Sequence, residues 1–210
     1  MTTTPTSPAQ RRTQAERSAA TIERLHAAAV ECLVDTGYAR SSTQDICQRA
    51  GVSQGALFRH FPSRVAFMIS LAEFIGRELV VQFAQRLRHT SEQQPTDIIS
   101  LALFLARANT RSPLQSAWTE LLVAARTDIE LQASLQPIWT RNRAEIREEA
   151  QQLFPMLMAQ MPDFDTAVDV VTMFYQGEAM NHWLNPAGEG DENRANWMAD
   201  RLRDAWKRPV

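Results

Sequence analysis

The 210-residue sequence has little of several residue types, and each scarcity excludes a class of protein. Only two cysteines occur, Cys32 and Cys47, too few for a disulfide framework, which predicts a reducing, cytoplasmic location. No apolar run approaches the about 18 residues of a transmembrane helix, and the polar N-terminus lacks the apolar segment of a signal peptide. Seven glycines and few β-branched runs argue against a β-sheet.

Lysine is also nearly missing, since Lys207 is the only one among 22 basic residues. Arginine, whose planar guanidinium group is always charged, therefore supplies every basic side chain near the N-terminus. Residues 1–64 contain eight arginines and five acidic residues, a net charge of +3, whereas residues 65–210 carry a net charge of −5. This asymmetry predicts a basic N-terminal unit that faces an anion.

The sequence has abundant helical periodicity. Five apolar residues between positions 22 and 33 share one face and predict a helix over about 13–35. Apolar stripes with Ser, Asp, Gly and Pro punctuation predict further helices at about 41–50, 53–60, 63–88, 96–110, 113–127, 129–153 (kinked or divided at Pro137), 164–184 and 191–207. We predict an all-α protein with a disordered tail (1–12), a helix-turn-helix head (13–62) and a helical-bundle body (63–210).

The segment Gly51-Val52-Ser53-Gln54-Gly55 matches G-x-S-x-G, the nucleophile elbow of a hydrolase. A nucleophile elbow is preceded by a buried strand, but the apolar residues within 43–50 recur with the spacing of a helix. Asp165 and His182 supply triad partners in the right chain order, so a Ser53 hydrolase stays open as a weaker alternative. A metal-dependent helical enzyme is a second alternative, although Glu23-Arg24-Leu25-His26 and the pair Glu178 and His182 are incomplete ligand sets.

The same segment suits a helix-turn-helix better. Ser53 would cap the second helix of the motif, whose N-terminal residues meet base edges in the DNA major groove. Gln54 can pair with an adenine edge, and Arg59 can reach phosphate or guanine. Gly55 would allow the backbone to approach DNA without an intervening side chain.

Residues 21–67 resemble the DNA-binding head of the TetR family of transcriptional regulators. The resemblance is carried by Gly37-Tyr38, Ser42-Thr43, Ile46, the run AGVSQGALFRHF (50–61) and Pro62-Ser63-Arg64. It implies base contacts from Ser53, Gln54, Gly55 and Ala56, and DNA contacts from Thr43 and Gln44 at the start of the preceding helix. It implies phosphate contacts from Phe58, His60 and Arg64, and a head core of Ile46, Cys47, Ala50, Val52, Leu57 and Phe61.

Three positions depart from the common pattern of the family, in which 54 is often lysine, 58 usually tyrosine and 64 usually lysine. Gln54 therefore shifts a phosphate contact toward base reading, and Phe58 lacks the hydroxyl that would bond a phosphate. Arg64 conserves the charge. These departures affect sequence preference and salt dependence rather than the expectation of DNA binding.

The resemblance also implies an apolar effector pocket and a dimerisation pair of helices in the body. We expect the pocket to include Trp118, Met173 and Tyr175, with Arg126 and Gln176 as polar anchors. We expect the dimer interface to include Phe174, Gly177, Asn181 and Leu184, which share one helical face.

The resulting hypothesis is a homodimeric repressor that binds a palindromic double-stranded operator and is released by a small, predominantly apolar effector. It needs no cofactor, no metal and no catalytic residue. A constitutive DNA-binding protein without an effector is an alternative. Cys32 and Cys47 are interpreted as small buried hydrophobic residues, with a thiol switch as the less favoured interpretation.

Overall fold

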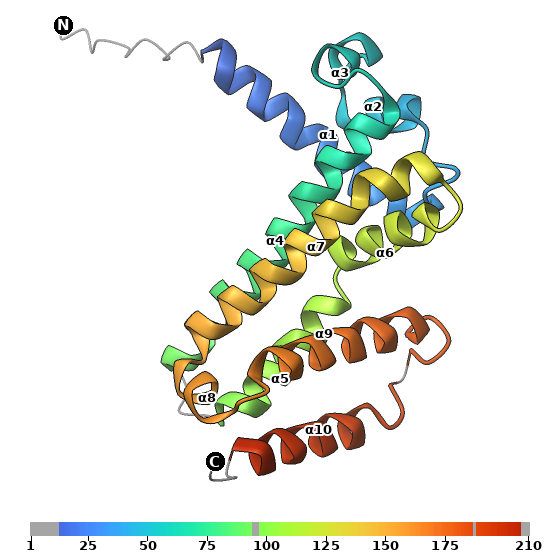
Figure 1. Ribbon diagram of the computed structural model, residues 1–210. Coiled ribbons are helices and arrows are strands. Elements are labelled where there is room, and N and C mark those ends of the chain that lie inside the picture. Colours follow the sequence, from blue (N-terminus) through green and yellow to red (C-terminus); the bar gives the residue numbers. More distant parts are fainter. Residues whose placement is uncertain (1–12, 94–96, 187, 207–210) are drawn as a thin grey trace, which may run out of the picture.

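The computed structural model describes residues 13–93, 97–186 and 188–206, and the regular structure in these ranges is helical throughout (Figure 1). The predicted disordered tail, 1–12, lies outside the described residues. The helices are α1 (Gln14–Thr36), α2 (Thr43–Ala50), α3 (Gln54–His60), α4 (Arg64–Gln93), α5 (Ile98–Thr110), α6 (Pro113–Ala125), α7 (Ile129–Leu153), α8 (Pro155–Gln160), α9 (Phe164–Asn181) and α10 (Asp191–Trp206). The all-α prediction is confirmed, and within these ranges no helix is long and apolar enough to span a membrane.

The bounds predicted for the helix at 129–153 are confirmed, and α7 is not divided at Pro137. One short helix of the body was missed and one boundary was wrong. Pro155 begins the short helix α8 instead of only ending a helix, because proline fits the first turn, where its missing N–H is not needed. α9 ends at Asn181, where the His182 N–H turns back to the Ala179 carbonyl, so the chain leaves the helix before position 184.

The head does not have a hydrophobic core of its own. Ile46 of α2 and Leu57 of α3 are fully buried in one continuous cluster with Phe67 of α4 and Leu121 of α6. α4 and α7 lie side by side and run from the head to the opposite end of the molecule (Figure 1). The helix-turn-helix and the body helices α4 and α6 therefore share one packed core.

The far end of the body is packed in a different way. α9 and α10 both pack on α5, and three smaller apolar clusters replace the single large one. Tyr175, Leu87 and Phe164 are buried members of these separate clusters. The space between the clusters is the cavity described below.

Candidate functional site

The helix-turn-helix is built by local capping. The Ser42 hydroxyl accepts the Asp45 N–H at 3.1 Å, and the Asp45 carboxylate accepts the Ser42 N–H at 3.4 Å, which closes a capping box at the start of α2. Gly51 ends α2 in the left-handed conformation, with φ 64° and ψ 38°. The Ser53 hydroxyl then accepts the Ala56 N–H at 3.2 Å and starts α3 two residues later.

The residues predicted to meet the bases lie together at the start of α3. Ser53, Gln54 and Gly55 are exposed and Ala56 is half-buried. At the start of α2, Gln44 is exposed and Thr43 half-buried. The structure thus places this set on the outer surface of the head, and their contacts with DNA remain predictions.

Two further predicted contacts, Phe58 and Arg59, lie one turn along the same helix. The Phe58 ring is 45% exposed, which is unusual for a phenylalanine beside a well-packed core. Arg59 is exposed and has no hydrogen bond or ion pair with any residue that the structure describes. Its guanidinium is therefore available to an anion outside the chain.

Gly55 is a helical glycine that the fold does not require. A Cβ built at this position would meet only the Ser53 hydroxyl, at the ordinary contact distance of 3.9 Å. Glycine inside a helix costs about 0.5–1 kcal/mol relative to alanine. The described residues therefore give no packing reason for this glycine, and the approach of DNA at Gly55 stays a prediction.

His60 and Arg64, both predicted to contact phosphate, already have partners within the chain. The His60 ring Nδ1 lies 3.5 Å from the Ser18 hydroxyl. The Arg64 guanidinium donates to the Tyr38 carbonyl at 2.8 Å and stacks over the Tyr38 ring, 4.1 Å from its centroid. Both side chains are half-buried, so any phosphate contact would have to be made while these interactions persist.

The residues predicted for the core of the head are buried or half-buried, but in a cluster that they share with α4 and α6. Ile46, Cys47, Leu57 and Phe61 are buried, and Ala50 and Val52 pack against them half-buried. Cys32 is equally buried, and burial raises the pKa of both thiols. Since oxidation proceeds through the thiolate, both sites are poorly suited to a redox switch.

The context of Ser53 is that of a helix cap. It follows the helix α2 and a tight turn, whereas a nucleophile elbow follows a strand. α9, which contains Asp165 and ends one residue before His182, lies at the opposite end of the molecule from α3 (Figure 1). Within the described ranges, no three His, Cys, Asp or Glu side chains gather into a group that could hold a metal ion.

A hydrogen bond that sequence reasoning missed links the head to α6. The Tyr38 N–H donates to Glu120 Oε2 at 2.9 Å, over 82 positions of sequence. Trp118, two residues earlier in α6, lines the cavity of the body. Nothing local marks Glu120, because its partner is a backbone group supplied by a distant turn.

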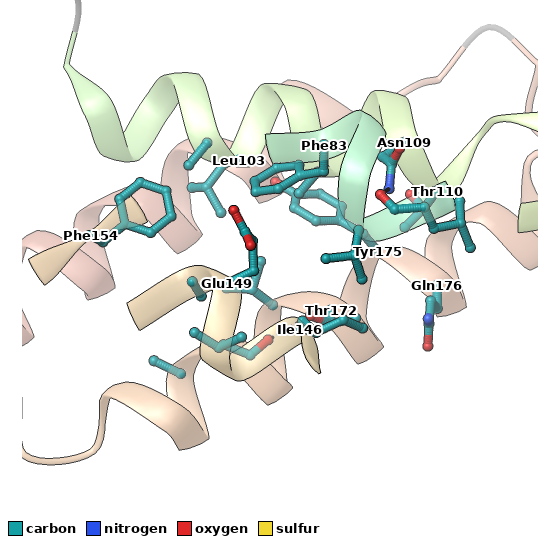
Figure 2. A pocket seen from close by; sticks show the side chains of 18 of the residues that line it. Phe83, Leu103, Asn109, Thr110, Ile146, Glu149, Phe154, Thr172, Tyr175 and Gln176 are labelled. Atoms are coloured by element: carbon teal, nitrogen blue, oxygen red, sulfur yellow. Dashed lines mark hydrogen bonds between the residues drawn. The ribbon is translucent and has the colours of Figure 1, made fainter. Parts of the chain in front are cut away.

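The body contains a cavity of about 180 Å³ between α4, α5, α6, α7 and α9, with further wall residues from α8 and α10. Figure 2 shows part of its wall, with Phe83, Leu103, Ile146 and Phe154 among the apolar side chains. Of the residues predicted to bind a ligand, Trp118, Tyr175 and Gln176 line this cavity.

Met173 and Arg126 do not line the cavity, which corrects their predicted placement. Met173 precedes Tyr175 by two positions in α9, about 200° around the helix axis, and its side chain is 53% exposed. Arg126 follows the last residue of α6 and is exposed. Sequence reasoning also missed Phe83, Leu103, Asn109 and Phe154, because a stripe facing a cavity has the same spacing as one facing a filled core.

The outer face of α9 is apolar and open. Val170, Met173 and Met180 are each more than half exposed and share this face with Gly177. Of the predicted dimer residues, Gly177 and Asn181 are exposed and Phe174 is half-buried. Leu184 lies beyond the end of the helix and is 88% exposed.

Behind this face, an ion-pair cluster ties α9 to α5 and α10. Glu178 accepts hydrogen bonds from Arg111 and from Arg194 Nε, each at 3.1 Å, and forms an ion pair with Arg107, whose Nε lies 2.9 Å from Glu178 Oε1. Asp191 pairs with Arg111 and Arg194, and these arginines hold the pKa of that carboxyl below its usual range although its burial opposes the shift. Glu178, considered above as one of two ligands of a possible metal site, is instead paired with arginine side chains.

The comparisons with known proteins agree with this architecture. The profile of the bacterial regulatory proteins of the tetR family matches residues 25–71. An HTH-type transcriptional regulator of Mycobacterium tuberculosis is 33% identical over 183 residues, which cover 87% of this chain and 93% of the relative.

Solved structures share the fold at low identity. A transcriptional regulator from Rhodococcus matches with a TM-score of 0.64 and 23% identity, over 88% of this chain and 95% of that one. The regulator FadR from Bacillus subtilis, solved in complex with stearoyl-CoA, matches with a TM-score of 0.56 and 18% identity, over 86% of this chain and 96% of that one.

Proposed function

We propose that this chain, which belongs to the tetR family of bacterial regulatory proteins and is a DNA-binding transcriptional regulator, is a cytoplasmic, homodimeric repressor. A small, predominantly apolar effector would release it from a palindromic operator. The observation that carries the proposal is the coexistence of an exposed helix-turn-helix surface and an apolar cavity joined by continuous packing.

On the DNA side, the proposal assigns base reading to the first turn of α3. Gln54 would read one base pair, Gly55 would admit the DNA backbone, and the α3 amides would face a phosphate. Arg59 and Arg64 would neutralise phosphates, with Arg64 held in position by Tyr38. The exposed side chains of Gln54 and Arg59 support these roles.

The exposed face of α9 supports the homodimer. A contiguous apolar helix face with a glycine at its centre favours packing against a second helix, because the glycine lets the two backbones approach closely. One recognition helix reads only a few base pairs. Two heads at a spacing of about 34–36 Å, or a multiple of it, read both halves of a palindrome.

The cavity supports the effector. A ligand there would contact α4 through Phe83 and α6 through Trp118. α4 begins at Arg64 in the head, and α6 carries Glu120, which holds the Tyr38 turn. A ligand that fits better when these two helices shift would change the spacing of the two heads and release the operator.

Retention of the upstream DNA of its own gene, at about 100 mM salt, tests the DNA-binding part of the proposal. We expect the full-length protein to retain this fragment in preference to a shuffled fragment of equal length, with a steep fall in affinity as salt rises. Equal retention of the two fragments would contradict an operator-specific role. A Ser53→Ala variant that loses a hydrolytic activity would instead support the enzyme alternative.

A further inference from the structure

Two polar groups on the wall of the cavity have no hydrogen-bond partner among the described residues: the Tyr175 hydroxyl and Asn109 Oδ1. Figure 2 shows both side chains among those that line the cavity. The Tyr175 side chain is completely buried, at 0% exposure. A buried hydroxyl without a protein partner is costly unless a bound water or a ligand supplies one.

Several other polar side chains of the wall are already used inside the protein, whereas the half-buried Gln176 has no hydrogen bond with any described residue. Asn142 donates to the Gly76 carbonyl at 3.0 Å, and Thr172 donates to Val168 one turn earlier at 2.7 Å. The Asn109 amide is itself held, because its Nδ2 donates to the Leu79 carbonyl at 3.1 Å, which leaves Oδ1 as the open acceptor. Tyr175 is therefore the one fully buried donor on the wall that lacks an acceptor in the described part of the chain.

The charge of the wall defines the ligand further. Among the described residues that line the cavity there is no Arg, Lys or His, and the only carboxylate, Glu149, is paired with Arg88. Arg107 lies outside, over the Tyr175 ring at 5.4 Å from its centroid, and is bound to Glu178. A charged ligand would enter without a counter-charge, which an apolar wall penalises strongly.

The remaining properties concern protonation and size. Burial raises the pKa of Tyr175, so its hydroxyl stays protonated and acts as a donor at neutral pH. The volume of about 180 Å³ is close to that of cavities of about 150 Å³ that hold a single aromatic ring. Apolar contact then supplies most of the affinity, and the one hydroxyl supplies orientation.

We propose that the cavity takes an uncharged, compact molecule of one or two rings or similar bulk, whose hydroxyl or carbonyl oxygen accepts a hydrogen bond from Tyr175. A ligand hydroxyl can in addition donate to Asn109 Oδ1 where its geometry allows. Carboxylates and other anions of the same size are excluded by the missing counter-charge. This inference rests on the proposed effector function and assigns the chemical class of the effector.

The test uses three probes with one skeleton: 2-naphthol, naphthalene and 2-naphthoate, titrated calorimetrically into the full-length protein. We expect 2-naphthol to bind about fivefold more tightly than naphthalene, the ratio that one hydrogen bond of typical net strength provides. We expect 2-naphthoate to bind more weakly than naphthalene.

Two matched variants locate the hydrogen bond. Tyr175→Phe removes a hydroxyl that has no partner, so the fold should be unharmed, and the advantage of 2-naphthol over naphthalene should disappear. Tyr38→Phe removes another buried hydroxyl without a partner, but in the head, and should leave that advantage unchanged.

Different results of this test would contradict different parts of the proposal. Tightest binding by 2-naphthoate overturns the assignment of an uncharged ligand. An advantage of 2-naphthol that is absent in the wild type, or that survives in Tyr175→Phe, overturns the role of the Tyr175 hydroxyl, although binding of any probe still supports an effector cavity. Binding of none of the three overturns the ligand class, while operator retention by the same preparation shows separately whether the proposed regulatory function holds.

Discussion

The head and the far end of the body use polar groups in opposite ways. In the head, Ser42, Asp45 and Ser53 satisfy the helix ends locally, and Arg59, which has no partner among the described residues, is exposed to solvent. In the body, the Tyr175 hydroxyl is without a partner inside an apolar cavity.

This difference matches the two partners proposed for the protein. DNA is a large, hydrated anion, so the side chains that contact it can be exposed to water in the free protein at little cost in free energy. A small apolar ligand gains its affinity by leaving water. The side chains that bind it must therefore already be buried in the free protein. The outer face of α9 is a third case, since its apolar side chains are exposed in the single chain and would be covered in the proposed homodimer.

The largest effect is expected from Met173→Glu, which places a charge on the exposed face of α9. In the monomer this position tolerates a polar side chain, but in the proposed dimer the charge would be desolvated. Affinity for the operator should fall to the level of non-specific DNA, a loss of at least about 10³-fold. Sedimentation measures the oligomeric state and gel shift the affinity. Ile129→Glu, at another exposed apolar position, should change neither.

The second effect concerns His26, which joins α1 to α4. Burial, with a contribution from the Arg77 charge, lowers its pKa from 6.5 to about 4, and its ring stacks on Phe74 and lies 3.1 Å from the Ser70 hydroxyl. In the unfolded chain His26 therefore takes up a proton near pH 6.5, whereas in the folded chain it does so only near pH 4. The free energy of unfolding consequently falls as the pH drops from 6.5 to 4.

Urea unfolding of the wild type and of His26→Gln at pH 7.5 and pH 4 measures this effect. The difference in unfolding free energy between the two proteins should shift by about 3 kcal/mol, against the wild type, at the lower pH. A difference that does not depend on pH would contradict a neutral, buried His26.

Gln54→Ala tests base reading in the head. We expect a loss of about 1–3 kcal/mol on the operator, a relaxed preference at one base position and little change on random DNA. Gln48→Ala, also exposed and glutamine but on α2, is the matched control. Equal losses on operator and random DNA would assign Gln54 to the phosphate backbone instead.

Glu120→Ala tests the long-range link between the two regions. Without the carboxylate, the part-buried Tyr38 N–H loses its acceptor, at a cost of about 1–2 kcal/mol in unfolding free energy. Glu120→Gln keeps an oxygen at the same place and should recover most of that loss. If both variants are as stable as the wild type, packing alone joins α6 to the head.

The smallest effect is expected at Gly55, where one substitution should change folding stability and operator binding in opposite directions. Gly55→Ala should stabilise the free protein by about 0.5–1 kcal/mol, because α3 gains a better helix former without a clash. The same methyl group should weaken operator binding. Gly51→Ala should instead destabilise the protein, since this residue has a φ of +64°. Thermal unfolding and gel shift on both variants separate the two outcomes, and undiminished binding by Gly55→Ala would remove the proposed role.

Much of the head could be predicted because its structure is local. Capping residues, Gly51 and the apolar residues Ile46 and Leu57 all lie within about twenty positions, and each interaction spans one helical turn or one tight turn. In the body, every helix except α8 was predicted at about its observed position, but the contacts between the helices were not. Met173 and Tyr175 look equivalent in the sequence, yet a rotation of about 200° around α9 puts one outside and one on the cavity wall.

The sequence by itself determined the all-α class, the helix-turn-helix with its caps and the residues at the start of α3, because hydrogen bonds and side-chain periodicity within a helix depend only on near neighbours. Only the tertiary structure decided where the cavity lies, that Glu120 holds the Tyr38 turn and that the Tyr175 hydroxyl is left without a partner. These features arise where faces of distant helices meet, and neither an empty space nor a missing partner has a local pattern.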